Sequence, residues 1–186
     1  MSRIFVTSDW HFNHEKPFLY EPRGFDAVWK MNNEIIARYN SLVKMDDEVF
    51  VLGDCMLGNN AVGAECIKQL KGQIHLILGN HDTNNRVEIY RGCWNICDIQ
   101  YADRIKYNGY HFYLSHYPSL TSNFDYEKPL SARTLNLCGH THTTDPFFHW
   151  QYGPIYHCEV DAHNCAPVLL DDIIVEMEKK YAETQR

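Results

Sequence analysis

The sequence of 186 residues lacks any long hydrophobic run. No apolar stretch approaches the roughly 20 residues that an α-helix needs to cross a bilayer. The first residues also lack a basic region followed by an apolar stretch, which a secretory signal would require. These absences predict a cytoplasmic protein with no membrane partner.

Paired cysteine motifs are missing as well. The seven cysteines are scattered, and no C-x-x-C occurs among them. An odd number at irregular spacing argues against both a disulfide framework and a thiolate zinc site. We interpret these cysteines as small buried hydrophobic residues in a reducing compartment.

The sequence has no excess of basic residues. Its 17 Lys and Arg stand against 24 Asp and Glu, which gives a formal net charge of −7. Such a surface is a poor footprint for a long nucleic-acid duplex, so we predict no extended nucleic-acid surface. A small phosphorylated substrate is still compatible with this charge, because bound divalent ions would dominate the local field.

What the sequence does contain is a set of five short apolar runs that end alike. The runs are residues 4–8, 49–53, 75–79, 112–115 and 135–139, and the polar residues that follow them are Asp9 with His11, Asp54, Asn80 with His81 and Asp82, His116, and His140 with His142. Each run is typical of a buried strand. A Ser or Gly at its end lets the backbone turn and lets an ion approach closely. Because α/β sheets bind ligands at the carboxyl ends of their strands, we expect one constellation of side chains.

In order and spacing, this constellation resembles the calcineurin-like metallophosphoesterases. The family pattern is Asp-x-His, Gly-Asp, Gly-Asn-His-Asp, a lone His and Gly-His-x-His, and all five parts are present between Asp9 and His142. The resemblance extends from residue 4 to about residue 165. Arg23-Gly24-Phe25 and Val160-Asp161 look most like the small single-domain bacterial and phage members.

The resemblance implies one domain over residues 1–186. It also implies an α/β (α+β) fold class: a four-layer αββα sandwich, with two mixed β-sheets packed face to face and helices outside. Residue periodicity agrees with α/β, since it predicts a helix capped by Asp26 over about 26–44, helices over about 61–70 and 84–90, and a final helix capped by Asp171. Two βα units predict parallel strands. Asn108-Gly109 predicts a hairpin, residues 117–134 a surface loop, and residues 155–160 a further strand.

The donor atoms of the motifs are imidazoles, carboxylates and one amide, without thiolates. This set suits borderline-to-hard divalent ions, manganese first, with iron, nickel or zinc as alternatives. By resemblance, two ions would bind with a shared carboxylate. Asp9, His11, Asp54 and His142 would hold one ion, and Asp54, Asn80, His116 and His140 the other.

The resemblance further implies a metal-dependent phosphoric ester hydrolase, a phosphatase or phosphodiesterase in which a metal-bridging hydroxide attacks the phosphoryl group. His81 would contact that group without binding metal and would protonate the leaving oxygen. Asp82 would orient the imidazole of His81. The substrate would be a small phosphomonoester or phosphodiester, and nucleotides are among the candidates.

Candidate substrate-binding residues lie outside the motifs. Residues 12–25 leave the first strand end and are rich in aromatic and charged side chains, so we expect them to wall the pocket. His14, Arg23 and Arg133 are the candidates, the two arginines because a guanidinium matches phosphate oxygens. The other five histidines are interpreted as surface or hydrogen-bonded core groups: His75, His111, His149, His157 and His163.

Two alternative functions stay open at this point. One is a nuclease acting on nucleic-acid ends, which the absence of a basic stripe disfavours. The other is a non-catalytic metal-binding scaffold, as in the retromer subunit that shares the fold. Scaffolds of that kind lose motif positions, whereas all are filled here. A homodimer is possible, and the sequence names no substrate.

Overall fold

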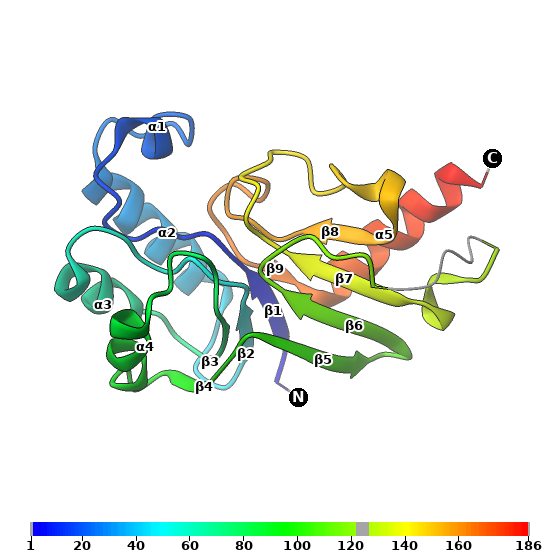
Figure 1. The fold of residues 1–186 in the computed structure, drawn as a ribbon, viewed down its shortest axis with the longest axis horizontal. Helices are drawn as coiled ribbons and strands as arrows, with labels where there is room; N and C mark the ends of the chain where they lie inside the picture. Colours follow the sequence, from blue (N-terminus) through cyan, green and yellow to red (C-terminus); the bar gives the residue numbers. More distant parts are fainter. Residues whose placement is uncertain (1, 122–126, 186) are drawn as a thin grey trace.

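The computed structural model describes residues 2–121 and 127–185. Two β-sheets form its centre (Figure 1). The first has the order β4-β3-β2-β1-β9 and consists of β1 (Ile4–Thr7), β2 (Glu48–Val51), β3 (Gln73–Ile77), β4 (Ile96–Gln100) and β9 (Val168–Leu169). The second has the order β5-β6-β7-β8 and consists of β5 (Ala102–Tyr107), β6 (Tyr110–Ser115), β7 (Thr134–Cys138) and β8 (Ile155–His157).

Both sheets are mixed. In the first, β1 to β4 are parallel neighbours and β9 pairs with β1 in the antiparallel sense, which confirms the parallel pairing that the βα units predict. In the second, an antiparallel hairpin of β5 and β6 is followed by two parallel pairs. The predicted turn is confirmed: Asn108 and Gly109 have φ values of 47° and 85°, as a type I′ turn requires.

Alternate residues of the first sheet enter two different cores. Val49 and Val51 pack on the helical side, whereas Phe50 and Leu52 pack toward the second sheet, where Phe112 is one of the residues that they join. This is the two-residue period of a strand that is buried on both faces. Each fully buried aliphatic side chain contributes about 1.5–3 kcal/mol. The face-to-face packing of two mixed sheets is therefore confirmed.

The helices are distributed unevenly around the sheets. The bounds of the described helices are α1 (Pro17–Tyr20), α2 (Val28–Leu42), α3 (Asn60–Lys68), α4 (Asn84–Arg91), α5 (Leu170–Thr184) and the short 3-10 turns η1 (Leu130–Ala132) and η2 (Trp150–Tyr152). The helices α2, α3 and α4 lie on the side of the first sheet (Figure 1). Helix α5 buries Leu170, Ile173 and Met177 in the core shared by the two sheets.

Two predicted helix caps are wrong. Helix α2 begins at Val28, and Asp26 binds Lys30 at 2.8 Å instead of capping the helix. Helix α5 begins at Leu170, so Asp171 lies in its first turn, where it accepts hydrogen bonds from Tyr107 and Asn108 of the hairpin. In both cases the carboxylate accepts hydrogen bonds from side-chain donors in place of the helix N–H groups.

The loop predicted over residues 117–134 falls partly outside the described residues, and its described end contains η1. The sequence patterns also missed α1 and β4, both of which are short. Within the described residues, no helix has the length and apolarity that crossing a membrane requires.

Candidate metal centre

The predicted ligands converge at one edge of the sandwich. Asp9, Asp54 and Asn80 follow β1, β2 and β3, whose carboxyl ends meet because the strands are parallel. His116 follows β6 and His140 follows β7 of the second sheet. The two sheets therefore contribute from opposite sides to a single cluster.

Strained backbone marks this cluster. Five of the predicted ligands have positive φ although none is glycine: Asp9 (57°), His11 (49°), Asp54 (55°), His140 (80°) and His142 (51°). A non-glycine residue in this region is uncommon and costs free energy, on the order of 1–3 kcal/mol. Such conformations persist where surrounding structure enforces them, and they concentrate at functional sites.

The motif glycines make room for ligands that come from other strands. A Cβ on Gly139 would lie 2.3 Å from Asp9 Oδ2, and one on Gly79 would lie 2.2 Å from Asp54 Oδ1. A Cβ on Gly53 would lie 2.7 Å from His116 Nδ1. The glycines were predicted to let an ion approach. The structure shows a more specific reason: each glycine leaves the space that a ligand side chain from another strand occupies.

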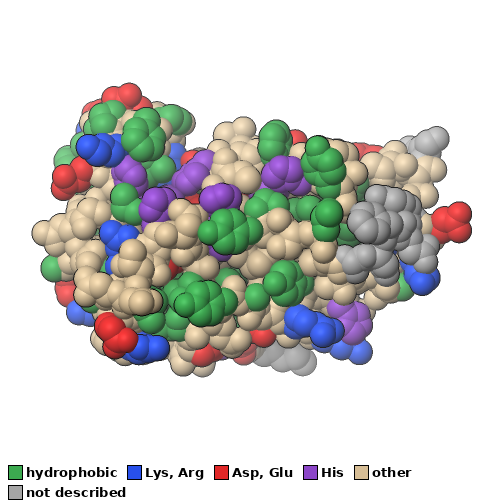
Figure 2. Space-filling view, in the orientation of Figure 1, with side chains coloured by type: hydrophobic (Ala, Val, Ile, Leu, Met, Phe, Trp, Pro, Cys, Tyr) green, Lys and Arg blue, Asp and Glu red, His purple; other side chains and the backbone are tan. Residues whose placement is uncertain are grey.

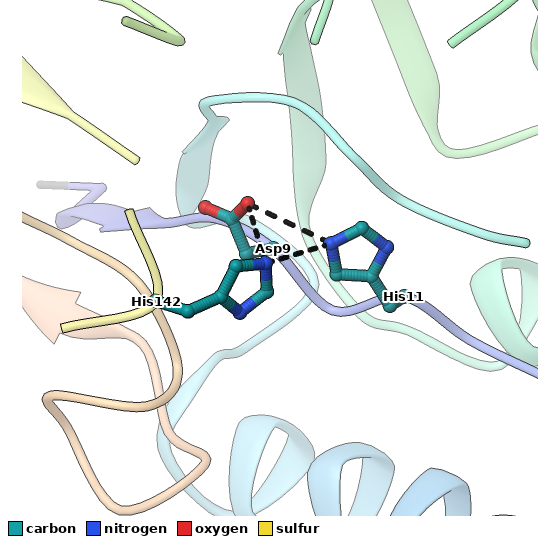
Figure 3. Close-up of side chains that lie close together, drawn as sticks. All are labelled: Asp9, His11 and His142. Carbon is teal, nitrogen blue, oxygen red and sulfur yellow. Dashed lines mark hydrogen bonds and ion pairs between the residues drawn. The ribbon is translucent and has the colours of Figure 1, made fainter. Parts of the chain in front are cut away.

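Asp9, His11 and His142 form the first ligand group (Figure 3). The Nε2 atoms of the two histidines lie 3.1 Å apart, and Asp9 Oδ1 lies 3.8 and 3.7 Å from them. Burial lowers the pKa of His11 to about 2, so its imidazole is neutral and can donate a lone pair. Burial raises the pKa of the Asp9 carboxyl to about 7, and its Oδ1 has no hydrogen-bond donor within the described residues.

The second group lies on the other side of Asp54. Asp9, Asp54 and His116 come close enough to hold one ion, which puts Asp9 nearer to this group than the resemblance implied. His116 Nε2 lies 3.0 Å from Asn80 Oδ1 and 3.2 Å from His140 Nδ1. The other ring nitrogen, Nδ1, lies 2.7 Å from the Leu52 carbonyl oxygen. It therefore carries the hydrogen in the neutral ring, and Nε2 carries the lone pair that a metal ion would take.

One oxygen of Asp54 stands between the two groups. Asp54 Oδ2 lies 3.6 Å from His11 Nε2 and 3.5 Å from His116 Nε2, while Oδ1 accepts the backbone N–H of His81. These donor atoms fit divalent ions, because buried imidazole nitrogens and carboxylate oxygens lie close enough together to hold a cation. Cys55 belongs to neither group, and burial raises the pKa of its thiol well above its usual value.

His81 and Asp82 are placed differently from each other. The His81 side chain is 45% exposed, and its Nε2 lies 4.0 Å from Asp54 Oδ2, beside the ligands. The buried Asp82 carboxylate accepts the N–H groups of Asp54 (2.7 Å) and Gly79 (2.8 Å) and the hydroxyl of Tyr90 (2.7 Å). The predicted role of Asp82 in orienting the His81 ring is therefore wrong, since the carboxylate ties together the loops after β2 and β3.

Arg23 lies behind the metal centre. Its guanidinium donates to both carboxylate oxygens of Asp161, at 2.8 and 2.7 Å, and to the carbonyl oxygens of Asp9 and Trp10. The side chain is only 2% exposed. These partners leave it no free face for a phosphate, so the predicted phosphate clamp is corrected to a support for the Asp9 loop.

Arg133 is also in the wrong place for substrate. It precedes β7 whereas His140 follows it, so the five-residue strand separates them by about 16 Å at roughly 3.3 Å per residue. Arg133 is buried and lines a small cavity with Trp150 and Tyr181. The prediction that it clamps phosphate is wrong for this geometric reason.

The predicted pocket wall, by contrast, lies at the site. A cavity of about 460 Å³ opens onto the first ligand group, and the residues lining it are His11, His14, Phe18, Leu19, Pro22, His81, His142 and Asp161. His14 thus borders the cavity, and its substrate contact stays a prediction. Burial lowers the pKa of His14.

Two carboxylates that the motifs did not reveal support the second-sheet ligands. Asp161 Oδ2 lies 3.0 Å from His142 Nδ1, and Glu159 accepts from the Thr141 hydroxyl at 2.8 Å and from its N–H at 3.2 Å. Burial raises the pKa of Asp161, but hydrogen bonds to His142 and Arg23 outweigh this and hold it below its usual range. For Asp161 the signal was its position directly after the strand predicted over residues 155–160, the same pattern that marked Asp9 and Asp54, whereas Glu159 lies inside that predicted strand and had no such signal.

The structure thus combines two packed mixed sheets with a buried Asp/His cluster that could hold metal ions. Residues 2–152 match the model of the calcineurin-like phosphoesterase superfamily domain. The chain therefore belongs to the calcineurin-like phosphoesterase superfamily.

One relative and one solved structure extend over nearly the whole chain, and a second relative over less than half of it. An uncharacterised protein of the archaeon Methanocaldococcus jannaschii, MJ1445, is 34% identical over 96% of this chain and 93% of its own length. The gene 66 protein of Mycobacterium phage L5 is 36% identical over 44% of this chain and 41% of its own. A protein of unknown function from Aquifex aeolicus, AQ665, has the same fold, with a TM-score of 0.71 and 19% identity over 94% of this chain and 98% of that one.

Proposed function

We propose that this protein hydrolyses a small phosphomonoester or phosphodiester with the help of two divalent ions. The observation that carries the proposal is the position of Asp54. Its Oδ2 lies within 3.6 Å of ligand nitrogens on both sides, one in each group, as a carboxylate shared by two ions would. Superfamily membership supports the same reaction class.

The chain's own residues divide the work. Asp9, His11, Asp54 and His142 would hold one ion, and Asp54, Asn80, His116 and His140 the other. Bound ions of this kind lower the pKa of water and offset negative charge on phosphoryl oxygens. The buried protein side of the site excludes bulk water, which strengthens these electrostatic effects.

His81 is the proposed proton donor to the leaving oxygen. Its ring borders the cavity and lies edge-on to His11, with 5.3 Å between ring centroids, so it reaches the space beside the ligands without joining them. The backbone on both sides of the ring is fixed, because its N–H binds Asp54 and its carbonyl accepts from Arg86. A general acid needs this combination of fixed position and access.

The test is hydrolysis of bis(p-nitrophenyl) phosphate by protein loaded with Mn²⁺. The wild type should turn over the diester, and His81→Ala should keep both ions in elemental analysis while its turnover falls, by roughly 10²–10⁴-fold for an ester whose leaving alcohol needs a proton. His111→Ala, a histidine on β6 outside the centre, is the matched control and should behave as wild type.

Leaving-group dependence separates proton donation from phosphate binding. The His81→Ala loss should shrink for nitrophenol, a good leaving group, and grow for an alkyl alcohol that needs a proton. Equal losses for both would restrict His81 to phosphate binding. A manganese-loaded wild type that hydrolyses neither monoesters nor diesters would instead identify a metal-binding scaffold.

A further inference from the structure

A row of aromatic rings leads from the metal centre to the surface along one wall of the cavity. His142 stacks on His11 with 4.9 Å between ring centroids, and His11 meets His14 edge-on at 5.7 Å. His14 in turn meets Phe18 edge-on at 5.4 Å. In Figure 2 the histidines gather beside the lobe that carries α1, and hydrophobic side chains cover part of that lobe.

Phe18 ends this row with an exposed face. Its side chain is 71% exposed, whereas the next residue, Leu19, is buried in the first core. The turn before α1 is fixed in two ways. Pro17 is the first residue of the helix, and the Lys16 N–H donates to His14 Nδ1. The helix is therefore anchored by Leu19 and presents Phe18 to the cavity that it lines.

The charges around the cavity limit which chemical groups could contact the Phe18 ring. Among the residues that line it, none is Lys or Arg, and the one carboxylate, Asp161, is occupied by Arg23 and His142. A second phosphate or a carboxylate would be desolvated here without a partner cation. An uncharged planar group would instead find an aromatic face, and a volume of about 460 Å³ lies in the range of small-molecule sites.

We propose that Phe18 stacks on an aromatic ring of the substrate, and that the substrate class is a nucleoside phosphoester with its base on α1 and its phosphoryl group at the metal centre. The inference rests on the proposed phosphoesterase function and adds the group that the enzyme recognises beside the phosphate. The spacing of the rings suits this class. The His14 ring lies 5.7 Å from the His11 ring and 5.4 Å from the Phe18 ring, so a sugar placed along His14 would join a phosphate beside His11 to a base on Phe18. Loss of base stacking on one aromatic side chain weakens binding by about tenfold or more.

The experiment compares binding of AMP and ribose 5-phosphate to the manganese-loaded protein by calorimetry. The two ligands share the sugar phosphate and differ in the base. We expect the wild type to bind AMP about tenfold or more tightly than ribose 5-phosphate. Phe18→Ala should weaken AMP binding to the level of ribose 5-phosphate and leave ribose 5-phosphate unchanged, while Phe18→Trp should retain the preference.

Trp94→Ala is the matched control, because Trp94 is an exposed aromatic residue (59%) before β4, at the end of the first sheet away from the centre. It should bind both ligands as wild type does. Equal wild-type affinity for the two ligands, or an AMP preference that survives in Phe18→Ala, would overturn the inference while leaving the phosphoesterase function intact. Failure of the wild type to bind either ligand would also overturn the inference, while the hydrolysis assay decides the phosphoesterase function separately.

Discussion

The two sheets hold the predicted metal ligands by different means. On the first sheet, backbone groups tie the loop after β1 to the loop after β2: the Asp9 N–H donates to the Gly53 carbonyl and the His11 N–H to the Asp54 carbonyl, both at 3.0 Å. On the second sheet, side chains do much of this work, because Asp161 supports His142 and Glu159 supports Thr141. Backbone ties survive most substitutions, whereas side-chain ties are lost with one residue.

This difference indicates which substitutions should disrupt the predicted metal centre. The first-sheet half depends on Asp54, which faces both ligand groups, and on Asp82, which gathers the loops after β2 and β3. The second-sheet half depends on Asp161, whose carboxylate is shared between His142 and Arg23. Substitutions at these three positions should therefore fail in distinguishable ways.

The largest effect is expected for Asp54→Asn. The amide has one oxygen and no charge, so it cannot serve both ligand groups as the carboxylate does. Both ions should be depleted in elemental analysis, and turnover should fall by roughly 10³-fold or more, because several kcal/mol of charge stabilisation depend on the ions. Wild-type metal content in this variant would contradict the bridging position of Asp54.

The next effect is expected for Asp161→Asn, on the second-sheet side. Loss of the carboxylate behind a ligating imidazole typically weakens metal binding or activity by about 10–100-fold. A competition titration with a metal chelator measures this. The matched control is Asp98→Asn, which removes the carboxylate partner of His75 far along β4 and should leave metal affinity unchanged.

Asp82→Asn should separate stability from metal affinity. Its carboxylate accepts two backbone N–H groups and the Tyr90 hydroxyl at 2.7–2.8 Å, and an amide leaves part of this set unpaired. We expect a loss of about 2–4 kcal/mol in the free energy of unfolding, measured by urea denaturation. If Asp82→Asn keeps wild-type stability but loses turnover, Asp82 acts on the chemistry instead of on the two loops.

The smallest effect concerns acid stability away from the centre. Burial raises the pKa of Asp47, but hydrogen bonds from Arg3 and from the Lys44 N–H outweigh it and lower the pKa to about 2. The unfolded chain therefore binds this proton first, so the pair's stabilisation is complete above about pH 4 and disappears as the pH falls toward 2. Between these limits the wild type should lose about 1–2 kcal/mol more than Asp47→Asn, with Arg3 partly exposed.

Asp47 also provides a comparison with the metal centre, because it precedes β2 whereas Asp54 follows the same strand at its other end. Asp47→Asn should leave metal content and turnover unchanged at neutral pH. Equal acid sensitivity of the wild type and Asp47→Asn between pH 4 and pH 2 would show that other carboxyl groups govern acid unfolding.

The sequence by itself predicted that the side chains at the strand ends converge. Asp9, Asp54 and Asn80 could be placed together because each directly follows a strand of apolar residues, and parallel strands bring their carboxyl ends to one edge. The hairpin at Asn108-Gly109 was equally readable, since a tight turn with positive φ is a local property of two residues.

Only the tertiary structure decided which charged residues face substrate and which support the site. Arg23 meets Asp161 across 138 positions of the chain, and Asp82 meets Asp54 across 28, so no local pattern could assign these pairs. A buried carboxylate or guanidinium takes the partners that the packed loops bring to it, because leaving any of them unpaired would be costly. For this reason Arg23 and Asp82 support the loops, while Phe18, one of the aromatic residues in the segment predicted to wall the pocket, faces the cavity.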